Sequence, residues 1–143
     1  MAACSQFLFL LVLLSPLPAI TQRETRHEKF LRQHNDFPKT DSHLDVRHYC
    51  NLMMQRRGMT NINCKPSNTF IHGSHESLDA ICREGGTHHS ENYYDSNAIF
   101  EITACRIMGN VQKQPCNYRG RVSFQRIRVA CQNGEPVHFK SPL

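Results

Sequence analysis

The chain has 143 residues, which favours one domain and excludes a long multidomain architecture. It carries 17 Lys and Arg against 12 Asp and Glu, a net charge of +5, together with nine histidines. This positive excess favours polyanionic partners: nucleic acid, heparin-like glycans or anionic membranes. It also fits ordinary solubility, so the charge alone does not choose among these functions.

The first 21 residues have the pattern of a signal peptide. An unbroken apolar run over residues 7–14 is followed by Ser15-Pro16-Leu17-Pro18, which breaks any helix. Small residues in Ala19-Ile20-Thr21 favour cleavage before Gln22. A membrane anchor is the alternative, but the run is too short to span a bilayer. We therefore expect a secreted, extracellular protein without stable membrane insertion.

Cysteine usage agrees with an oxidising compartment. Of seven cysteines, Cys4 would leave with the signal peptide, and an even set of six remains. Six cysteines in a secreted domain indicate three disulfides, whose pairing the spacing does not fix. Zinc binding is the weaker alternative, because no C-x-x-C pair is present.

The first half of the mature chain has helical periodicity. We expect a first helix over Arg23–Asp36, with His34 near its end. A second helix follows the candidate N-cap Asp45 and stops near Gly58. A third, short helix is expected over Ser77–Cys82.

The second half has strand periodicity. Ala98–Met108 predicts a long strand, and Arg121–Cys131 predicts another with a bulge or bend between Phe124 and Ile127, where the apolar alternation changes parity. Asn133-Gly134 predicts a hairpin turn that returns the chain as a strand carrying His138. The expected fold class is α+β, with three helices packed on a bent antiparallel β-sheet.

Three short motifs resemble those of the pancreatic ribonuclease (ribonuclease A) superfamily. They are Lys29-Phe30-Leu31-Arg32-Gln33-His34, Cys64-Lys65-Pro66-Ser67-Asn68-Thr69-Phe70 and Pro136-Val137-His138-Phe139. They occur in the family's order, and the resemblance covers essentially all of residues 22–143. It implies a ribonuclease A-like domain that cleaves RNA without a metal or other cofactor.

The chemistry of RNA cleavage explains why these residue types matter. The 2′-OH needs a base and the 5′-oxygen needs an acid, and histidine suits both roles near neutral pH. A lysine beside the phosphate stabilises the charge that develops in the transition state. The resemblance implies His34 as base, His138 as acid and Lys65 as this cation.

The resemblance also implies substrate contacts. Gln33 matches a phosphate-contacting glutamine, Thr69 a reader of the pyrimidine edge and Phe139 a residue packed beside that base; Asn68 completes the expected substrate-binding set. For Thr69 and Phe139, ordinary strand propensity and core packing remain open as alternatives.

The family implies the disulfides Cys50–Cys105, Cys64–Cys116 and Cys82–Cys131. A fourth bridge of the pancreatic type is missing, as is typical of the angiogenin branch. The segment Phe70–Gly73 and the expected loop His89–Asn92 are similar to angiogenin, whose loop before the long strand is implicated in cell-surface binding. Arg56-Arg57-Gly58 falls at that branch's nuclear-targeting stretch, implying uptake to the nucleus or nucleolus. Cations favourably placed at a helix C-terminus are the alternative.

The sequence departs from the family in two places near His138. Lys140 stands where an aspartate usually orients the acid histidine, so we expect a lower pKa for His138, reduced activity and a more acidic pH optimum. Gln132 replaces a frequent glutamate, which predicts weaker contacts to the base on the 3′ side of the cut. With Ser141 where angiogenins have an obstructing glutamine, the pyrimidine pocket is expected to be open.

Three functions compete. The first is a slow, angiogenin-like endoribonuclease that cleaves single-stranded RNA or tRNA on the 3′ side of pyrimidines through a 2′,3′-cyclic phosphate. The second is a cationic antimicrobial protein, and the third a receptor-binding angiogenic ligand that has lost the chemistry. The antimicrobial alternative depends on exposed arginines, namely Arg56, Arg57, Arg119, Arg121, Arg126 and Arg128. We expect a monomer, with RNA, a cell-surface receptor, heparin-like glycans or ribonuclease inhibitor as partners.

Overall fold

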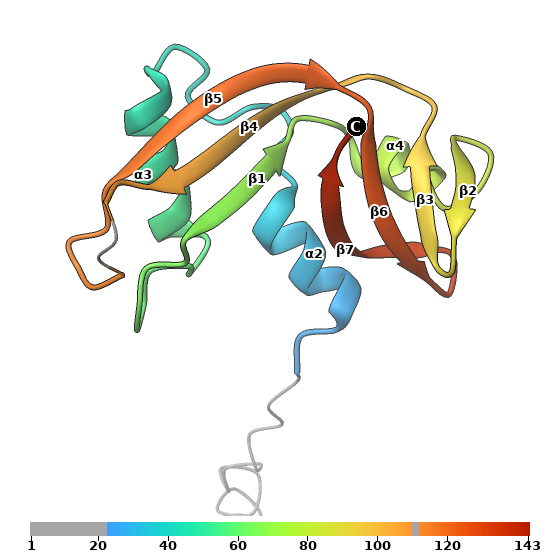
Figure 1. Cartoon of the computed structure of the whole chain (residues 1–143), viewed down its shortest axis with the longest axis horizontal. Coiled ribbons are helices and arrows are strands. Elements are labelled where there is room, and N and C mark those ends of the chain that lie inside the picture. Colours follow the sequence, from blue (N-terminus) through green and yellow to red (C-terminus); the bar gives the residue numbers. More distant parts are fainter. Residues whose placement is uncertain (1–22, 110–111) are drawn as a thin grey trace, which may run out of the picture.

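The computed structural model describes residues 23–109 and 112–143 (Figure 1). The described residues form helices α2 (Arg26–His34), α3 (Val46–Arg56) and α4 (His75–Ala80), followed and interleaved by seven strands. The expected signal peptide, residues 1–21, lies outside the described residues. Among the described residues, no helix is long and apolar enough to cross a membrane.

Helix α2 is shorter than the predicted 23–36. Thr25 is its N-cap and forms a capping box with Glu28, which starts the helix at Arg26. The helix ends at His34 because Asn35 is extended and forms a β-bridge with Ile71. His34 is therefore the last helical residue and lies beside the sheet.

Helices α3 and α4 are also set by their caps. Asp45 caps α3, as predicted, and its side chain accepts a hydrogen bond from the His48 amide. The chain leaves the helix at Gly58, whose φ is +77°. Helix α4 begins at His75, two residues before the predicted start, because the Ser74 hydroxyl accepts from the Ser77 amide.

The predicted α+β class with antiparallel strands is confirmed, and the strands form two sheets. One sheet has the order β1 (Ser67–Ile71), β4 (Phe100–Ile107), β5 (Tyr118–Gln125). The other has the order β2 (Gly86–Ser90), β3 (Tyr93–Ser96), β6 (Ile127–Gln132), β7 (Glu135–Pro142).

The predicted break between Phe124 and Ile127 marks the passage between the two sheets. The chain leaves β5 after Gln125 and enters β6 at Ile127. Ser96 of β3 fixes this corner, because its carbonyl accepts from Arg126 Nε and its hydroxyl from the Ile127 amide. The change in the alternation of apolar residues therefore coincides with the passage of the chain from one sheet to the other.

Two turns shape the second sheet. Asn133 and Gly134 have φ of +53° and +75°, which fits the predicted two-residue hairpin turn into β7. The segment 89–92, expected to be a loop, belongs to the β2–β3 hairpin, with Glu91 at a φ of +48° in its turn.

Each sheet covers its own core. Tyr49, Met53, Phe70 and Tyr118 are among the residues buried between α3 and the first sheet. Phe30, Leu78, Ile127 and Val129 are among those buried beneath α2 and α4. Helix α2 lies between the two sheets (Figure 1) and so carries His34 to the junction of the two cores.

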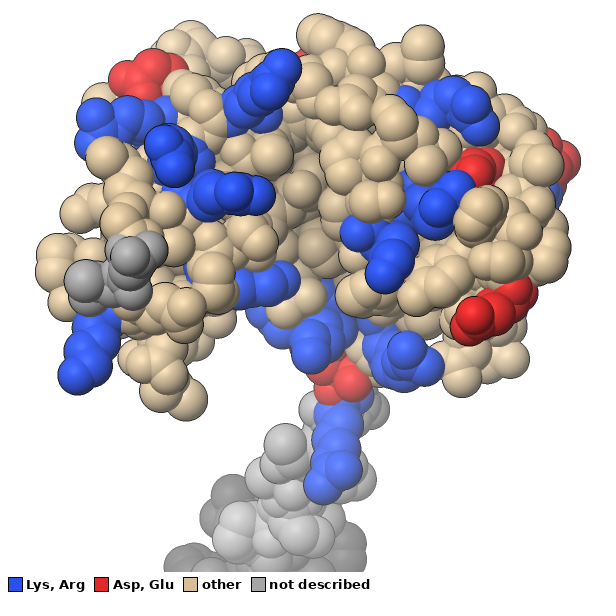
Figure 2. All heavy atoms as spheres, viewed as in Figure 1, with Lys and Arg blue, Asp and Glu red and all other residues tan. Residues whose placement is uncertain are grey.

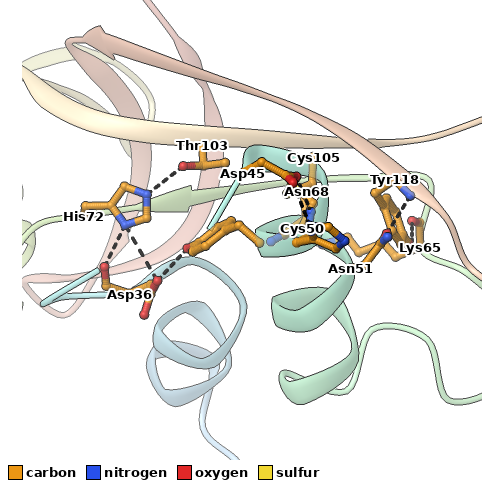
Figure 3. Close-up of a disulfide and its surroundings, with 12 residues drawn as sticks. Asp36, Asp45, Cys50, Asn51, Lys65, Asn68, His72, Thr103, Cys105 and Tyr118 are labelled. Carbon is orange, nitrogen blue, oxygen red and sulfur yellow. Dashed lines mark hydrogen bonds and ion pairs between the residues drawn. A yellow bond between two sulfur atoms is a disulfide. The ribbon is translucent and has the colours of Figure 1, made fainter. Parts of the chain in front are cut away.

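Three disulfides join the elements, and their pairs are those that the family resemblance implies. Cys50–Cys105 ties α3 to β4 (Figure 3), Cys64–Cys116 links the segments before β1 and β5, and Cys82–Cys131 joins the end of α4 to β6. Their Cα–Cα distances are 5.6, 5.5 and 5.8 Å.

Candidate active site

His34 is held in one orientation by its surroundings. Its Nδ1 lies 2.8 Å from the carbonyl oxygen of Thr69, and the side chain is only 8% exposed. Because a carbonyl oxygen only accepts, Nδ1 carries the hydrogen, and the neutral ring keeps an unprotonated Nε2. The rings of Phe30 and Phe139 flank the imidazole, with centroids 5.3 and 5.4 Å from the centroid of the His34 ring.

The surroundings of His34 favour its neutral form. The pKa of His34 is lowered to about 4, mainly by burial; the charges of Lys65 and His138 contribute to this lowering, and the bond to Thr69 opposes it. His34 is therefore a proton acceptor at neutral pH.

Lys65 is connected to α2 through Asn68. Lys65 Nζ donates to Asn68 Oδ1 at 3.1 Å, and Asn68 Nδ2 donates to the Gln33 carbonyl oxygen at 2.7 Å. Tyr118 OH donates to the Lys65 carbonyl at 2.7 Å and fixes its backbone (Figure 3). Burial lowers the pKa of Lys65, as do the neighbouring charges of Lys29 and Arg32.

His138 is the exposed member of the set. It lies on β7 opposite Ala130, directly after a β-bulge at Val137 that interrupts the ladder with β6. Burial of part of the ring lowers its pKa, and the charges of Lys140, Lys65 and Arg26 lower it further. The lowering by Lys140 agrees with the expectation from the sequence.

These residues meet in two adjoining hollows of about 220 and 270 Å³. Gln33, His34 and His138 line both. Lys65, Asn68, Thr69, Phe139 and Lys140 line the larger hollow, together with Ser67. The described residues that line the two hollows include no carboxylate. Figure 2 shows Lys and Arg side chains on both sides of the central hollow.

Two further cations line the smaller hollow. Arg26 and Lys29 lie there beside Gln33, and sequence reasoning gave neither a role. Arg26 and Lys29 precede Gln33 by seven and four residues, and this helical spacing was the signal that could have placed the three on one face.

The residues that differ from the family pattern have definite contacts. Lys140 Nζ lies 5.6 Å from the centroid of the Tyr93 ring, near enough for a cation–π interaction. The Gln132 side-chain oxygen accepts from Arg26 at 2.8 Å. Gln132 is therefore already engaged by α2.

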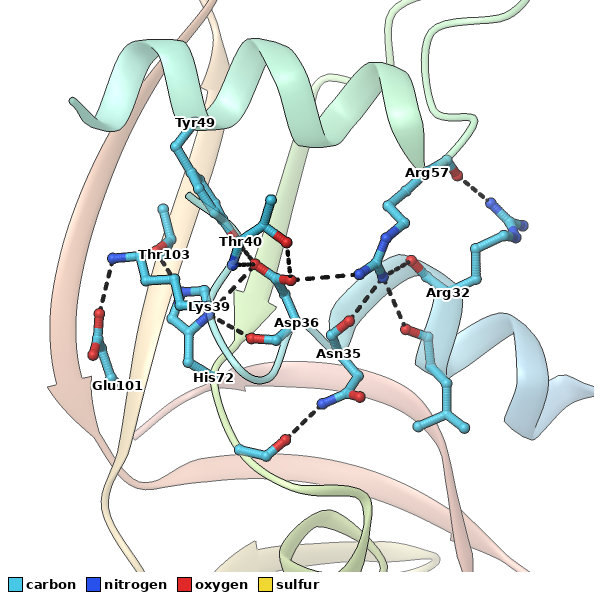
Figure 4. Close-up of polar contacts among 12 residues, drawn as sticks. Arg32, Asn35, Asp36, Lys39, Thr40, Tyr49, Arg57, His72, Glu101 and Thr103 are labelled. Atoms are coloured by element: carbon cyan, nitrogen blue, oxygen red, sulfur yellow. Dashed lines mark hydrogen bonds and ion pairs between the residues drawn. The ribbon is translucent and has the colours of Figure 1, made fainter. Parts of the chain in front are cut away.

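The suggested nuclear-targeting stretch has a structural use. Arg57 Nη1 donates to the carbonyls of Arg32 and Asn35 at 2.8 and 2.7 Å, and its Nη2 lies 3.6 Å from Asp36 Oδ1 (Figure 4). The alternative of cations at a helix C-terminus fits both residues, because Arg56 lies in the last turn of α3 and Arg57 is its C-cap. The Arg57 side chain also binds carbonyls at the end of α2. Arg56 remains exposed beside Gly58.

The arginines of the antimicrobial alternative are not all free. Arg128 forms a two-bond ion pair with Asp95, at 2.6 and 3.0 Å, and Arg126 Nε binds Ser96. Arg119 and Arg121 are exposed on β5. Within the described part of the chain, no group of three or more His, Cys, Asp or Glu is placed to hold a metal ion.

Known proteins share both the sequence and this fold. The crystal structure of green turtle egg white ribonuclease superposes with a TM-score of 0.82 at 53% identity, covering 84% of this chain and all of that one. A ribonuclease of Chelonia mydas is 55% identical over 81% of this chain and 97% of its own length. Angiogenin of Mus musculus is 40% identical over 92% of this chain and 88% of its own length.

The profile of the pancreatic ribonuclease family matches residues 25–140, which include His34, Lys65 and His138. The fold and the family match define the class of protein, a pancreatic-type endoribonuclease. The chain belongs to the pancreatic ribonuclease family, and angiogenins are among its relatives.

Proposed function

We propose that this protein cleaves single-stranded RNA, including tRNA, on the 3′ side of pyrimidines, using His34, His138 and Lys65. The observation that carries the proposal is the fixed His34 ring: its Nδ1 is committed to the Thr69 carbonyl, and the side chain lines a hollow shared with His138. A ring held in this way offers one nitrogen as a base.

The reaction follows from these positions. His34 Nε2 takes the proton from the 2′-OH, and the 2′-oxygen forms a bond to phosphorus. The bond from phosphorus to the 5′-oxygen breaks, and protonated His138 gives its proton to that oxygen. The products are a 2′,3′-cyclic phosphate and a free 5′-hydroxyl. DNA lacks the attacking 2′-OH and should not be cleaved.

Lys65 stabilises the charge that develops on the phosphorane. Its ammonium group is directed by Asn68, and burial strengthens its electrostatic effect. Gln33 lines both hollows and is suited to contact the phosphate. These groups can perform the reaction without a metal, and cleavage in EDTA should persist.

Pyrimidine preference is assigned to Thr69 and Phe139, which line the larger hollow together. Past Phe139 the chain continues in the β6–β7 ladder, with Ser141 paired to Arg128. This path supports an open pyrimidine pocket. Lys140 disfavours protonated His138, which supports a low, angiogenin-like activity at neutral pH.

Secretion after cleavage of residues 1–21 is part of the proposal, and it fits the three disulfides. A monomer is also proposed. A cell-surface receptor, heparin-like glycans and ribonuclease inhibitor remain proposed partners, and nuclear uptake would have to use Arg56 without a free Arg57.

The test is cleavage of matched dinucleotides by the disulfide-bonded protein with and without EDTA. UpA and CpA should be cleaved to cyclic phosphates, detectable by phosphorus NMR, whereas ApA and GpA should not. Equal cleavage of all four would refute the roles of Thr69 and Phe139. Cleavage that disappears in EDTA and returns with a divalent metal would refute the metal-independent mechanism.

A further inference from the structure

His27 contacts β7 just before the acid histidine. Its Nδ1 lies 2.9 Å from the carbonyl oxygen of Pro136, and its side chain is 17% exposed. Because the carbonyl can only accept, the ring donates through Nδ1. This bond connects α2 to the strand that carries His138.

The other ring nitrogen faces two carboxylates. His27 Nε2 lies 3.3 Å from Glu135 Oε2 and 3.6 Å from Asp79 Oδ1. Asp79 Oδ1 is buried and accepts no hydrogen bond from the described residues. The imidazole of His27, on α2, thus contacts both α4 and β7. Of the charged neighbours on its own helix, Arg26 binds Gln132 and Glu28 binds the Thr25 amide.

The bond to Pro136 lies at one of the two interruptions of the β6–β7 ladder. Pro136 pairs with Cys131 and His138 pairs with Ala130, so Val137 is an extra residue on β7. A bulge of this kind leaves one residue unpaired and re-aims the next side chain. Pro136 has no amide hydrogen to donate to β6. The carbonyl oxygen of Pro136 accepts a hydrogen bond from His27, and this bond is an additional attachment for the strand at this point.

The same helix carries the base histidine. His34 follows His27 by seven residues, which is two helical turns, so both side chains lie on the same face of α2. His27 lines neither of the two hollows at His34 and His138. It is therefore placed to fix both catalytic elements without touching the substrate.

We infer that His27 is a positioning residue, whose bond to the Pro136 carbonyl fixes the bulge before His138 and so sets the separation of the acid and the base. The inference rests on the proposed function, in which His138 is the acid. It requires the Nδ1 donor specifically, because only that nitrogen reaches the backbone of β7.

Two amide substitutions separate the contacts of the ring. The amide nitrogen of His27→Asn lies near the position of Nδ1 and can still donate to Pro136, whereas that of His27→Gln lies near Nε2 and faces the carboxylates. On UpA, His27→Asn should keep kcat within about threefold of the wild type. His27→Gln and His27→Ala should lower kcat by roughly tenfold, with KM changed by less than about threefold, because misplacement affects the chemical step.

The control is His88→Asn, which removes an exposed histidine whose contacts, with the Glu91 carbonyl and the Tyr94 ring, lie within the β2–β3 hairpin. This variant should match the wild type. Thermal melting identifies the folded fraction of each protein. Equal kcat in folded His27→Asn, His27→Gln and wild type would overturn the inference, as would equal losses in the two amide variants.

A second readout does not depend on turnover. The NMR signals of the His138 ring should move in His27→Gln and stay near the wild-type positions in His27→Asn. Unchanged His138 signals in both variants would overturn the inference. Absence of RNA cleavage by the wild-type protein would refute the proposed function, whereas the NMR comparison would still decide whether His27 positions His138.

Discussion

Lys140 lies two residues after His138 on β7, and both residues line the larger hollow. Its ammonium group lowers the pKa of His138, in addition to the effect of burial. A lower pKa leaves less of the protonated acid at neutral pH. In the proposed mechanism, activity at neutral pH therefore depends on Lys140, a residue outside the proposed catalytic set.

We predict that Lys140→Asp raises the alkaline limb of the pH–kcat/KM profile by about one unit, since a repulsive charge is replaced by an attractive one. At pH 7 the rate on UpA should increase by roughly threefold to tenfold. For Lys140→Gln, which only removes the charge, the alkaline limb and the rate at pH 7 should lie between those of the wild type and of Lys140→Asp. An unchanged limb in Lys140→Asp would show that Lys140 does not control the acid.

The wild-type profile itself should be acidic. The acid limb should fall near pH 4, the pKa of His34, because activity is lost when the base becomes protonated. The alkaline limb should fall below the usual histidine value of about 6.5, because the pKa of His138 is lowered. Initial rates between pH 3.5 and 8 measure both. A maximum above pH 7 would contradict this assignment.

At the scale of elements, Arg57 connects the ends of α2 and α3. Its guanidinium satisfies carbonyl groups that the end of α2 leaves without partners, and it approaches the buried Asp36. Tyr49 OH adds a bond of 2.5 Å to the same carboxylate (Figure 4). These contacts hold α2 against α3.

Arg57→Ala should lower the free energy of unfolding by about 2–4 kcal/mol, because it leaves buried acceptors and a buried carboxylate without this donor. Arg56→Ala, at the exposed neighbouring position, should change it by less than about 0.5 kcal/mol. Urea denaturation measures both. Similar small effects would mean that Arg57 is a surface residue available to partners.

The sequence predicted those elements whose signals are local. The Asp45 cap, the Asn133-Gly134 turn and the parity change before Ile127 were each interpreted correctly from neighbouring residues. The start of α2 was misplaced although Thr25 and Glu28 form a local capping-box pattern that could have been read. The contacts of the Arg57 side chain with the end of α2 could not be predicted, because these partners lie 21 to 26 positions away along the chain.

The same limit applies to the site. The family resemblance supplied His34, Lys65 and His138, which the structure places around shared hollows. It gave no role to His27, whose contacts with Pro136 and Asp79 depend on how α2, α4 and β7 pack. Such contacts between distant segments leave no periodic signal in the sequence.

For the whole molecule, His34 couples the active site to acid stability. Its folded pKa of about 4 lies below the unfolded value of about 6.5, so the unfolded chain binds the proton first as the pH falls. This group should cost roughly 3 kcal/mol of stability as the pH falls from about 6.5 to 4. His34→Gln should show a flatter dependence in urea denaturation; an identical slope would contradict the burial argument.

RNA cleavage by His138 and the substrate's own 2′-OH is the central proposal for this protein. The decisive measurement is the initial rate on UpA and on its 2′-deoxy analogue, with wild-type protein and His138→Ala, all in EDTA. We predict that wild-type protein cleaves only UpA and that His138→Ala loses at least about a hundredfold in rate. Cleavage of the deoxy analogue, or an unchanged rate in His138→Ala, would contradict the mechanism.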